Sequence, residues 1–290
     1  MVLVKVTNPE TNETKEFYMN EWLRNQLDSK VIPALNKKDE DYVLIVDGGE
    51  RKGKSVFSQQ IGGYVDPTLC LNRICFNANE FREAIIKANK GQCIIYDEAF
   101  RGLSSKGTLS EVNKILVSLM MEMGQKNLFI IINLPTYFLL EKYVALWRAR
   151  GLFHVYSHRG RKGFWKFFNK EKKQRLYLLG KKEYNYQKVR SKITGRFTNF
   201  YFTDEDEYRK KKDTSLKQGF KTSNGYIDKN TVERDILIKE LYKSKGIGIR
   251  KLHELLKQSG LDIGRGKLEG ILRVKERDVP KTDPSQRPII

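Results

Sequence analysis

Two hydrophobic patterns alternate along the first half of the chain. Four short runs are almost entirely apolar, which is typical of strands buried on both faces of a parallel sheet. They cover residues 41–47, 93–97, 128–133 and 152–156. Between them, apolar residues recur every three or four positions, which predicts amphipathic helices over residues 80–90, 108–126 and 137–148. Strands that alternate with helices predict an α/β fold with a mainly parallel sheet and right-handed crossovers.

The pattern changes beyond residue 158. Residues 163–168 and 175–179 are rich in aromatic and aliphatic side chains and are separated by a polar stretch, which predicts a β-hairpin. Residues 180–228 have weak periodicity and are predicted to be a loosely structured linker. Helical periodicity returns in three segments, residues 232–243, 248–258 and 264–275. The last stretch, 279–290, contains three prolines and is predicted to be a tail.

A glycine-rich motif directly follows the first predicted strand. It consists of two glycines that bracket four residues and are followed by Lys and Ser, which is the P-loop pattern. In such a loop, backbone N–H groups surround phosphates at the start of the next helix. We predict that Lys54 reaches the β- and γ-phosphates of ATP and that the Ser55 hydroxyl ligates Mg²⁺. The predicted nucleotide contacts are Gly48, Gly49, Glu50, Arg51, Lys52, Gly53, Lys54, Ser55 and Val56. The alternative interpretation is a solvated glycine-rich turn.

Two acidic residues end the second predicted strand. Asp97 would hold Mg²⁺ through water at the carboxyl end of that strand, where open α/β sheets bind ligands. Glu98 would activate the attacking water as a general base. The alternative is a pair of acids that caps a strand, and the P-loop pattern upstream favours the catalytic interpretation.

Other polar residues are weaker candidates. Asn133 ends the third predicted strand and either contacts the γ-phosphate or attacking water, or simply ends the strand. Arg148 and Arg150 close the next predicted helix, where they either act in trans as arginine fingers in a ring or interact with the C-terminal helix dipole. Arg101 is a third candidate for the arginine finger.

Three segments carry a resemblance to a known group of ATPases. Residues 48–55, 93–100 and 128–133 resemble the P-loop ATPases of the additional-strand, RecA-like class. Residues 125–135 and 146–150 extend the similarity to the DNA-pumping motors of the FtsK–HerA group, which include zonular-occludens-toxin-like phage proteins and viral packaging ATPases. The resemblance covers roughly residues 40–158. The chain departs from the group in two ways. It has Asn133 where glutamine is frequent, and no membrane span is predicted in it, although zonular-occludens-like proteins usually carry one.

The charge distribution predicts a polyanionic partner. Hydrophobic residues make up 39% of the chain and charged residues 31%, which indicates a globular protein, and the net charge is +20. Residues 159–221 carry 20 basic and 7 acidic side chains, a net charge of +13. Basic residues alternate there with aromatic ones, and we predict that Arg161, Lys162 and Lys166 bind DNA phosphates. A solvated run of charges is the alternative.

The C-terminal helices predict a second DNA-binding element. The helix, short glycine-containing turn and helix over residues 249–273 have the layout of a helix-turn-helix. Arg265 and Lys267 lie at the start of the second helix, where side chains would meet bases or phosphates. A three-helix structural or oligomerisation bundle is the alternative.

These features predict four parts of the chain. They are a P-loop ATPase domain with an N-terminal extension (1–158), a basic hairpin and linker (159–228), a helix-turn-helix-like domain (229–278) and a tail (279–290). We predict an ATP- and Mg²⁺-dependent ATPase that translocates or packages DNA as a homo-oligomeric ring. The alternative is a nucleotide-dependent DNA-binding switch or loader that does not translocate.

The sequence also leads to expectations about partners and location. The resemblance implies a viral or mobile-element context, with DNA and a viral portal or capsid component as partners. The longest apolar run is too short to cross a bilayer, so no membrane span is predicted. Three cysteines form no disulfide framework, which favours a reducing compartment and predicts a cytoplasmic protein.

Overall fold

The structure is a computed structural model of a chain that divides into two compact units. It describes residues 1–97, 117–118, 126–223, 237–242, 248–259, 261 and 263–273. The N-terminal unit comprises residues 1–221 and the C-terminal unit residues 222–290.

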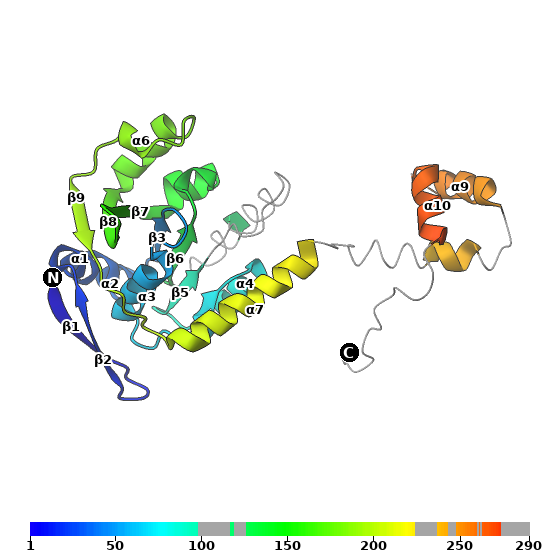
Figure 1. The fold of residues 1–290 in the computed structure, drawn as a ribbon. Coiled ribbons are helices and arrows are strands. Elements are labelled where there is room, and N and C mark those ends of the chain that lie inside the picture. The colour runs from blue at the N-terminus through cyan, green and yellow to red at the C-terminus, as the bar shows by residue number, and fades with distance from the viewer. Residues whose placement is uncertain are drawn as a thin grey trace. The chain divides into compact units, whose positions relative to one another are not determined.

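A seven-stranded sheet forms the centre of the N-terminal unit (Figure 1). Its strands are β3 (Tyr42–Asp47), β4 (Ile74–Cys75), β5 (Cys93–Tyr96), β6 (Phe129–Leu134), β7 (Ala149–His158), β8 (Arg161–Asn169) and β9 (Ile193–Arg196). The strand order is β4-β5-β6-β3-β7-β8-β9. The first five strands in this order run parallel, and β8 and β9 continue the sheet antiparallel. The predicted α/β fold with a mainly parallel sheet is confirmed.

Helices cover both faces of the sheet. Among the described residues of this unit, the α-helices that follow β3 are α3 (Lys54–Val65), α4 (Ala78–Lys87), α6 (Lys170–Gly180) and α7 (Glu205–Ser223). Alternate residues of β3 enter opposite apolar clusters: Ile45 packs with residues of α4 and α6, and Val46 packs with residues of α3. Because both faces are buried, the central strands are apolar at every position, as the sequence pattern indicates.

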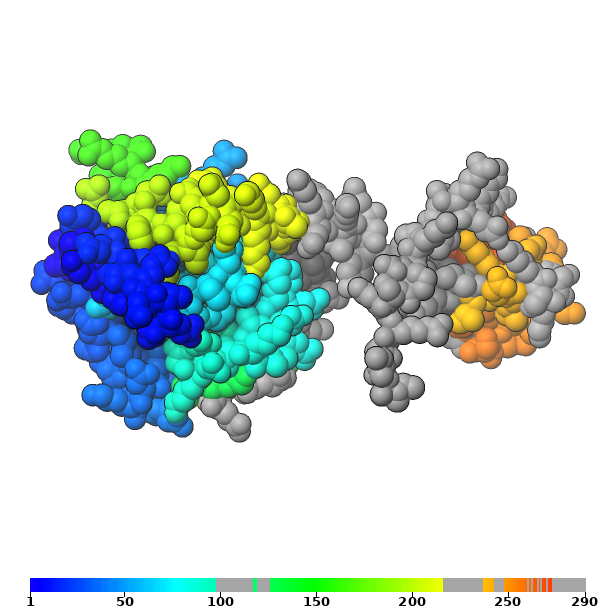
Figure 2. Space-filling model, turned by 90° about the horizontal axis from the view of Figure 1, so that it is seen from below, coloured from blue at the N-terminus to red at the C-terminus, as the bar shows by residue number. Residues whose placement is uncertain are grey.

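The N-terminal segment packs on the α3 side of the sheet. It contains the hairpin β1 (Val2–Thr7) and β2 (Thr14–Met19), then α1 (Glu21–Gln26), a π-helical turn (Leu27–Val31) and α2 (Ile32–Asn36). The ring of Phe17 stacks on Phe200 with centroids 4.9 Å apart, and Lys15 Nζ donates to the Phe202 carbonyl at 2.9 Å. Figure 2 shows the blue hairpin β1–β2 beside the yellow-green part of the chain, to which Phe200 and Phe202 belong.

The predicted hairpin after residue 158 is wrong in its second half. Residues 161–169 form β8, but β8 pairs with β7 rather than with residues 175–179, which belong to α6. The Asn169 side chain accepts a hydrogen bond from the Lys172 backbone and caps that helix. Leu176 and Tyr177 are buried on its inner face. The predicted domain boundary at residue 158 therefore falls inside one continuous sheet.

The predicted linker over residues 180–228 is also wrong for residues 180–223, the part that the structure describes. It contains β9, α7 and a 3₁₀ turn at Tyr186–Lys188. Between β9 and α7, residues 197–203 form a strap over α3. Gln60 Nε2 donates to the carbonyls of Thr198 and Phe200 at 2.7 and 3.0 Å, and Gln59 Oε1 accepts from the Thr203 hydroxyl at 3.0 Å. These contacts join distant parts of the chain, so no local periodicity announces them.

Two other predicted helices have different outcomes. Residues 137–148 form a 3₁₀ turn (Tyr137–Leu139) and a π-helical turn (Val144–Arg148) instead of one α-helix. A further 3₁₀ turn at Leu71–Arg73 precedes β4. The predicted helix over 108–126 lies largely outside the described residues.

The C-terminal unit contains short helices around a small apolar core. Residues 237–242 are helical, and α9 (Ile249–Gln258) and α10 (Arg265–Arg273) follow. The buried side chains come from all three segments and the turn between the last two: Ile238, Leu252, Leu256, Ile263, Leu268 and Ile271. The last two predicted helices are confirmed, whereas the helix-turn-helix function stays a prediction and the tail over 279–290 lies outside the described residues.

A buried lysine makes the stability of the N-terminal unit depend on pH. Lys173 is fully buried, its Nζ donates to the carbonyls of Ala145 and Leu146, and burial lowers its pKa to about 7. The unfolded chain keeps this proton up to about pH 10. Because the folded-state pKa is the lower one, stability rises with pH between about 7 and 10, by at most about 1.4 kcal/mol per pH unit.

We expect Lys173→Met to remove this contribution, because methionine fills the same space without a titrating group. The free energy of unfolding in urea should be measured at several pH values between 7 and 10. All three tryptophans lie in the N-terminal unit, so their fluorescence reports its unfolding. Equal pH slopes in the variant and the wild type would contradict the assignment.

Candidate functional site

The glycine-rich loop lies at the carboxyl end of the central parallel strand. β3 ends at Asp47, the loop occupies residues 48–53, and α3 begins at Lys54. Gly48 has φ +140°, and a Cβ there would lie 2.1 Å from the Val155 carbonyl oxygen of β7. Gly53 has φ +96°, in the region that favours glycine. The backbone geometry therefore requires both outer glycines.

The Lys54 side chain folds back over this loop. Its Nζ donates to the carbonyl oxygens of Gly48 and Gly49 at 2.8 and 2.9 Å. The ammonium thus lies within the loop, where phosphate oxygens could replace the carbonyls as acceptors. Gly49, Glu50 and Arg51 are exposed. Lys52, Gly53, Lys54 and Ser55 are half-buried, while Gly48 and Val56 are buried.

A buried hydrogen-bonded chain connects α3 to the end of β5. Ser58 Oγ donates to Asn133 Oδ1 at 2.5 Å, and Asn133 Nδ2 donates to Asp97 Oδ1 at 2.9 Å. All three side chains are buried. Asn133 therefore orients the Asp97 carboxylate, and its predicted contact with a γ-phosphate or water stays a prediction.

Sequence reasoning missed the second partner of Asp97. The Tyr208 hydroxyl, on α7, donates to the other oxygen of the same carboxylate. The Tyr208 ring is buried and lies 5.7 Å from Phe76 and 5.6 Å from Tyr201, measured between ring centroids. The signal available in the sequence was a single aromatic residue, Tyr208, in the otherwise polar run of residues 203–215. With two donors already in place, Asp97 stays an oriented acceptor at the carboxyl edge of the sheet.

A second buried carboxylate was missed as well. Asp47 directly precedes the loop, and its Oδ1 lies 2.9 Å from His154 Nδ1. Its Oδ2 accepts from the Tyr137 backbone N–H at 2.8 Å and from the Tyr186 hydroxyl. Burial and the neighbouring Asp47 raise the pKa of Tyr186 well above its usual value, so Tyr186 stays a donor. Four segments of the chain thus meet at the residue before Gly48.

The structure places the arginine-finger candidates away from the loop of their own subunit. Arg148 forms an ion pair with Asp41, and Arg150 forms one with Glu40 at 2.9 Å. Both acids precede β3, whereas the loop follows its other end, six residues or about 20 Å away. An arginine finger acting in trans would therefore have to leave its ion pair. Glu98 and Arg101 lie outside the described residues.

The groups that are present fit a nucleotide phosphate and Mg²⁺. For phosphate, the loop offers Lys54 and backbone N–H groups at the start of a helix. For Mg²⁺, Ser55 and Asp97 offer side-chain oxygens that can act as ligands. Across the described residues, no group of three or more His, Cys, Asp or Glu side chains could hold a metal ion by itself. Mg²⁺ needs no such group, because it retains water and binds substrate phosphates.

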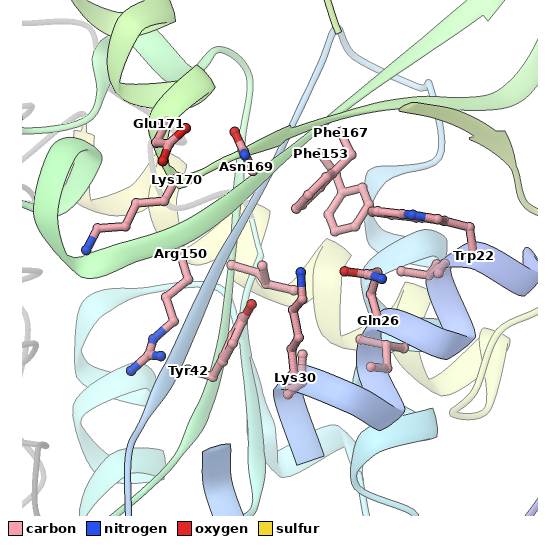
Figure 3. A pocket seen from close by; sticks show the side chains of 14 residues that line it. Trp22, Gln26, Lys30, Tyr42, Arg150, Phe153, Phe167, Asn169, Lys170 and Glu171 are labelled. Carbon is pink, nitrogen blue, oxygen red and sulfur yellow. The ribbon is translucent and has the colours of Figure 1, made fainter. Parts of the chain in front are cut away.

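A cavity lies between α1 and strands β3, β7 and β8 (Figure 3). Its volume is about 260 Å³, and Trp22, Lys30, Tyr42, Phe153 and Phe167 are among its lining residues. No residue of the glycine-rich loop lines it. This cavity is therefore not the predicted ATP site.

The predicted DNA contacts fall in both units. Arg161, Lys162 and Lys166 are exposed on β8. Arg265 is the first residue of α10, and Lys267 lies in its first turn.

Comparisons with protein-family models and with curated proteins found no match. None of the described helices is long and apolar enough to cross a membrane.

The bond from Tyr208 to Asp97 can be tested by its contribution to stability. Tyr208→Phe keeps the buried ring and removes one hydrogen bond to a charged acceptor, so we expect the free energy of unfolding to fall by about 1–3 kcal/mol. Tyr201→Phe, in the neighbouring ring, is the matched control and should change it by less than about 0.5 kcal/mol. Tryptophan fluorescence in urea measures both. Equal stabilities of the two variants would show that the bond does not hold Asp97.

Proposed function

We propose that this chain is an ATP-hydrolysing motor that translocates or packages DNA, acting as a homo-oligomeric ring. The observation that carries the proposal is the glycine-rich loop between β3 and α3, with the Lys54 ammonium inside it. A strand, a loop with obligatory glycines and a helix start together form a site for anionic phosphates. Among phosphate ligands, the P-loop pattern of the loop sequence favours nucleoside triphosphates.

The strand order supports the same assignment. β6 lies between β3, which leads into the loop, and β5, which ends before Asp97. This inserted strand is the feature that names the additional-strand class of ATPases, to which the sequence is similar. Its polar residue, Asn133, connects α3 with the residue that follows β5, through hydrogen bonds to Ser58 and Asp97.

Each residue has a distinct role in the proposed reaction. Lys54 would exchange its two carbonyl acceptors for phosphate oxygens and stabilise the negative charge that develops on them. Mg²⁺, when bound, would neutralise phosphate charge, with Ser55 and Asp97 as its protein-side oxygen donors. Asn133 and Tyr208 keep the Asp97 carboxylate oriented. Glu98, the next residue in the sequence, would accept a proton from the attacking water.

The basic last part of the N-terminal unit, residues 159–221, supports DNA as the partner. The excess of 20 basic over 7 acidic side chains in residues 159–221 suits a phosphate backbone. β8, which carries Arg161, Lys162 and Lys166, is separated from the loop strand by β7 alone. DNA bound there would lie two strands from the nucleotide, close enough for its binding to alter the loop.

Loss of the loop lysine tests the ATPase proposal. Lys54→Ala should lower ATP turnover at least about 100-fold, because a charge-assisted contact to the transferred phosphate is lost. Turnover should be measured with and without DNA. Lys87→Ala, an exposed lysine of α4, is the control and should retain wild-type turnover. Normal turnover in Lys54→Ala would refute the P-loop assignment.

The ring is tested by mass. We expect the full chain to form a closed oligomer in the presence of ATP and DNA, because a trans-acting arginine requires a neighbouring subunit. Light scattering after size exclusion, with and without each ligand, measures the assembly. A monomer under all conditions would contradict a ring motor and favour a non-translocating switch.

A further inference from the structure

Strands β7, β8 and β9, which form one end of the sheet, contain no acidic residue. β7, β8 and β9 lack Asp and Glu along their whole lengths, as do residues 185–203 around β9. The same strands carry Arg150, Arg161, Lys162, Lys166 and Arg196. The positive charge of these three strands is therefore uncompensated within the strands themselves.

One face of these three strands is open to solvent. The register pairs Tyr156 with Phe164, Phe164 with Arg196 and Lys166 with Thr194, so these side chains share a face. Tyr156 and Phe164 are half-buried, and Lys166, Thr194 and Arg196 are exposed. We call these five residues the outer face.

The opposite face of the same strands is part of the core. Val155 and Trp165 alternate with the outer-face residues and are buried in the α3-side cluster. The Trp165 ring lies 6.0 Å from Phe57 of α3, measured between centroids. The outer face therefore has a rigid backing.

The rings and cations of the outer face are already arranged in pairs. Lys166 Nζ lies 5.0 Å from the centroid of the Tyr156 ring, and the Arg196 guanidinium carbon lies 5.0 Å from that of Phe164. The two rings are themselves neighbours, with centroids 5.8 Å apart. Among the described residues, no carboxylate forms an ion pair with Lys166 or Arg196. Each ring thus has a cation beside it that can form an ion pair with an anionic ligand.

We propose that the outer face binds single-stranded nucleic acid, with unpaired bases stacked on Tyr156 and Phe164 and phosphates paired with Lys166 and Arg196. This inference rests on the proposed DNA-dependent function and specifies the form of its substrate. A base that stacks on either ring takes the place of the cation above it, and the cation moves to the backbone phosphate. Duplex bases already stack on each other, so an aromatic sheet surface favours unpaired ones.

The position of the outer face also connects it to the glycine-rich loop. Tyr156 directly follows Val155, whose carbonyl oxygen leaves no room for a side chain at Gly48. His154, two residues before Tyr156, holds Asp47 at the start of the loop. A strand bound on Tyr156 would therefore lie beside the backbone that shapes the phosphate site.

The test compares wild type and variants of the full chain on matched probes. Fluorescence anisotropy measures the binding of labelled oligo(dT), oligo(rU), an abasic deoxyribose-phosphate strand and a duplex, all of equal length. Tyr156→Leu and Phe164→Leu keep apolar volume but remove the aromatic ring. Tyr18→Leu, an exposed tyrosine of β2, is the control.

Each leucine variant should bind oligo(dT) and oligo(rU) about 5- to 100-fold more weakly than wild type, the cost of a lost base stack. Its affinity for the abasic strand, and all affinities of Tyr18→Leu, should change less than about twofold. Tighter binding of oligo(dT) than of oligo(rU) assigns the site to DNA, and the reverse order assigns it to RNA. Unchanged oligo(dT) binding, equal losses on the abasic strand, or tighter binding of duplex would overturn the proposal.

The two cations have a separate readout. Lys166→Gln and Arg196→Gln should weaken binding of the abasic strand as well as oligo(dT), and each should reduce the slope of log affinity against log salt by about 0.7. Lys87→Gln, an exposed lysine of α4 outside the basic segment 159–221, is the control and should leave the slope unchanged. An unchanged slope in both cation variants would refute the phosphate contacts.

Failure of this inference differs from failure of the proposed function. If no ATP is hydrolysed under any condition but the leucine variants still lose oligo(dT) binding, the ATPase proposal is refuted and the proposed binding of single strands to the outer face is supported. If duplex DNA stimulates ATP hydrolysis and the leucine variants bind oligo(dT) like wild type, the proposed binding to the outer face is refuted and the ATPase proposal is supported.

Discussion

Two carboxylates buried at the carboxyl edge of a parallel sheet determine much of this structure. A buried carboxylate is costly unless its oxygens accept hydrogen bonds, so each must be surrounded by donors. Asp47 takes its donors from His154, Tyr186 and the Tyr137 backbone, and Asp97 takes its donors from Asn133 and Tyr208. The donors come from β6, β7, a 3₁₀ turn, the segment after α6, and α7. Satisfying the two carboxylates therefore brings five separate segments to the carboxyl edge of the sheet.

Helix α3 also holds the strap over residues 197–203 through hydrogen bonds, besides packing in the core. Gln59 and Gln60 are buried polar residues on a helix that is covered on all sides, and they bind the strap over residues 197–203. The strap also contacts the N-terminal hairpin through Phe202 and Lys15. The same helix begins at Lys54 and carries both glutamines, so α3 connects the glycine-rich loop with the strap.

The extension β7–β9 separates the two chemistries proposed for the unit. Its inner face contributes Trp165 to the core, while its outer face presents rings and cations without carboxylates. β7 belongs to both regions, since it pairs with β3 on one edge and with β8 on the other. The proposed nucleic-acid surface and the strand that leads into the glycine-rich loop therefore share β7 as a neighbour.

The sequence by itself determined the parallel strands, the position of the loop and the two C-terminal helices. Those features depend on local patterns: apolar runs for β3, β5 and β6, glycines where the backbone needs them, and three-to-four spacing for α9 and α10. Only the tertiary structure decided the pairing of β8 with β7, the helical state of residues 170–180, and the roles of Tyr208, Tyr186 and His154. Lys173 lies in a segment whose polar composition predicts an exposed turn, yet it is buried and its Nζ donates to two backbone carbonyls. Such outcomes depend on donors and acceptors that are distant in the sequence, and local periodicity carries no information about which distant groups will meet.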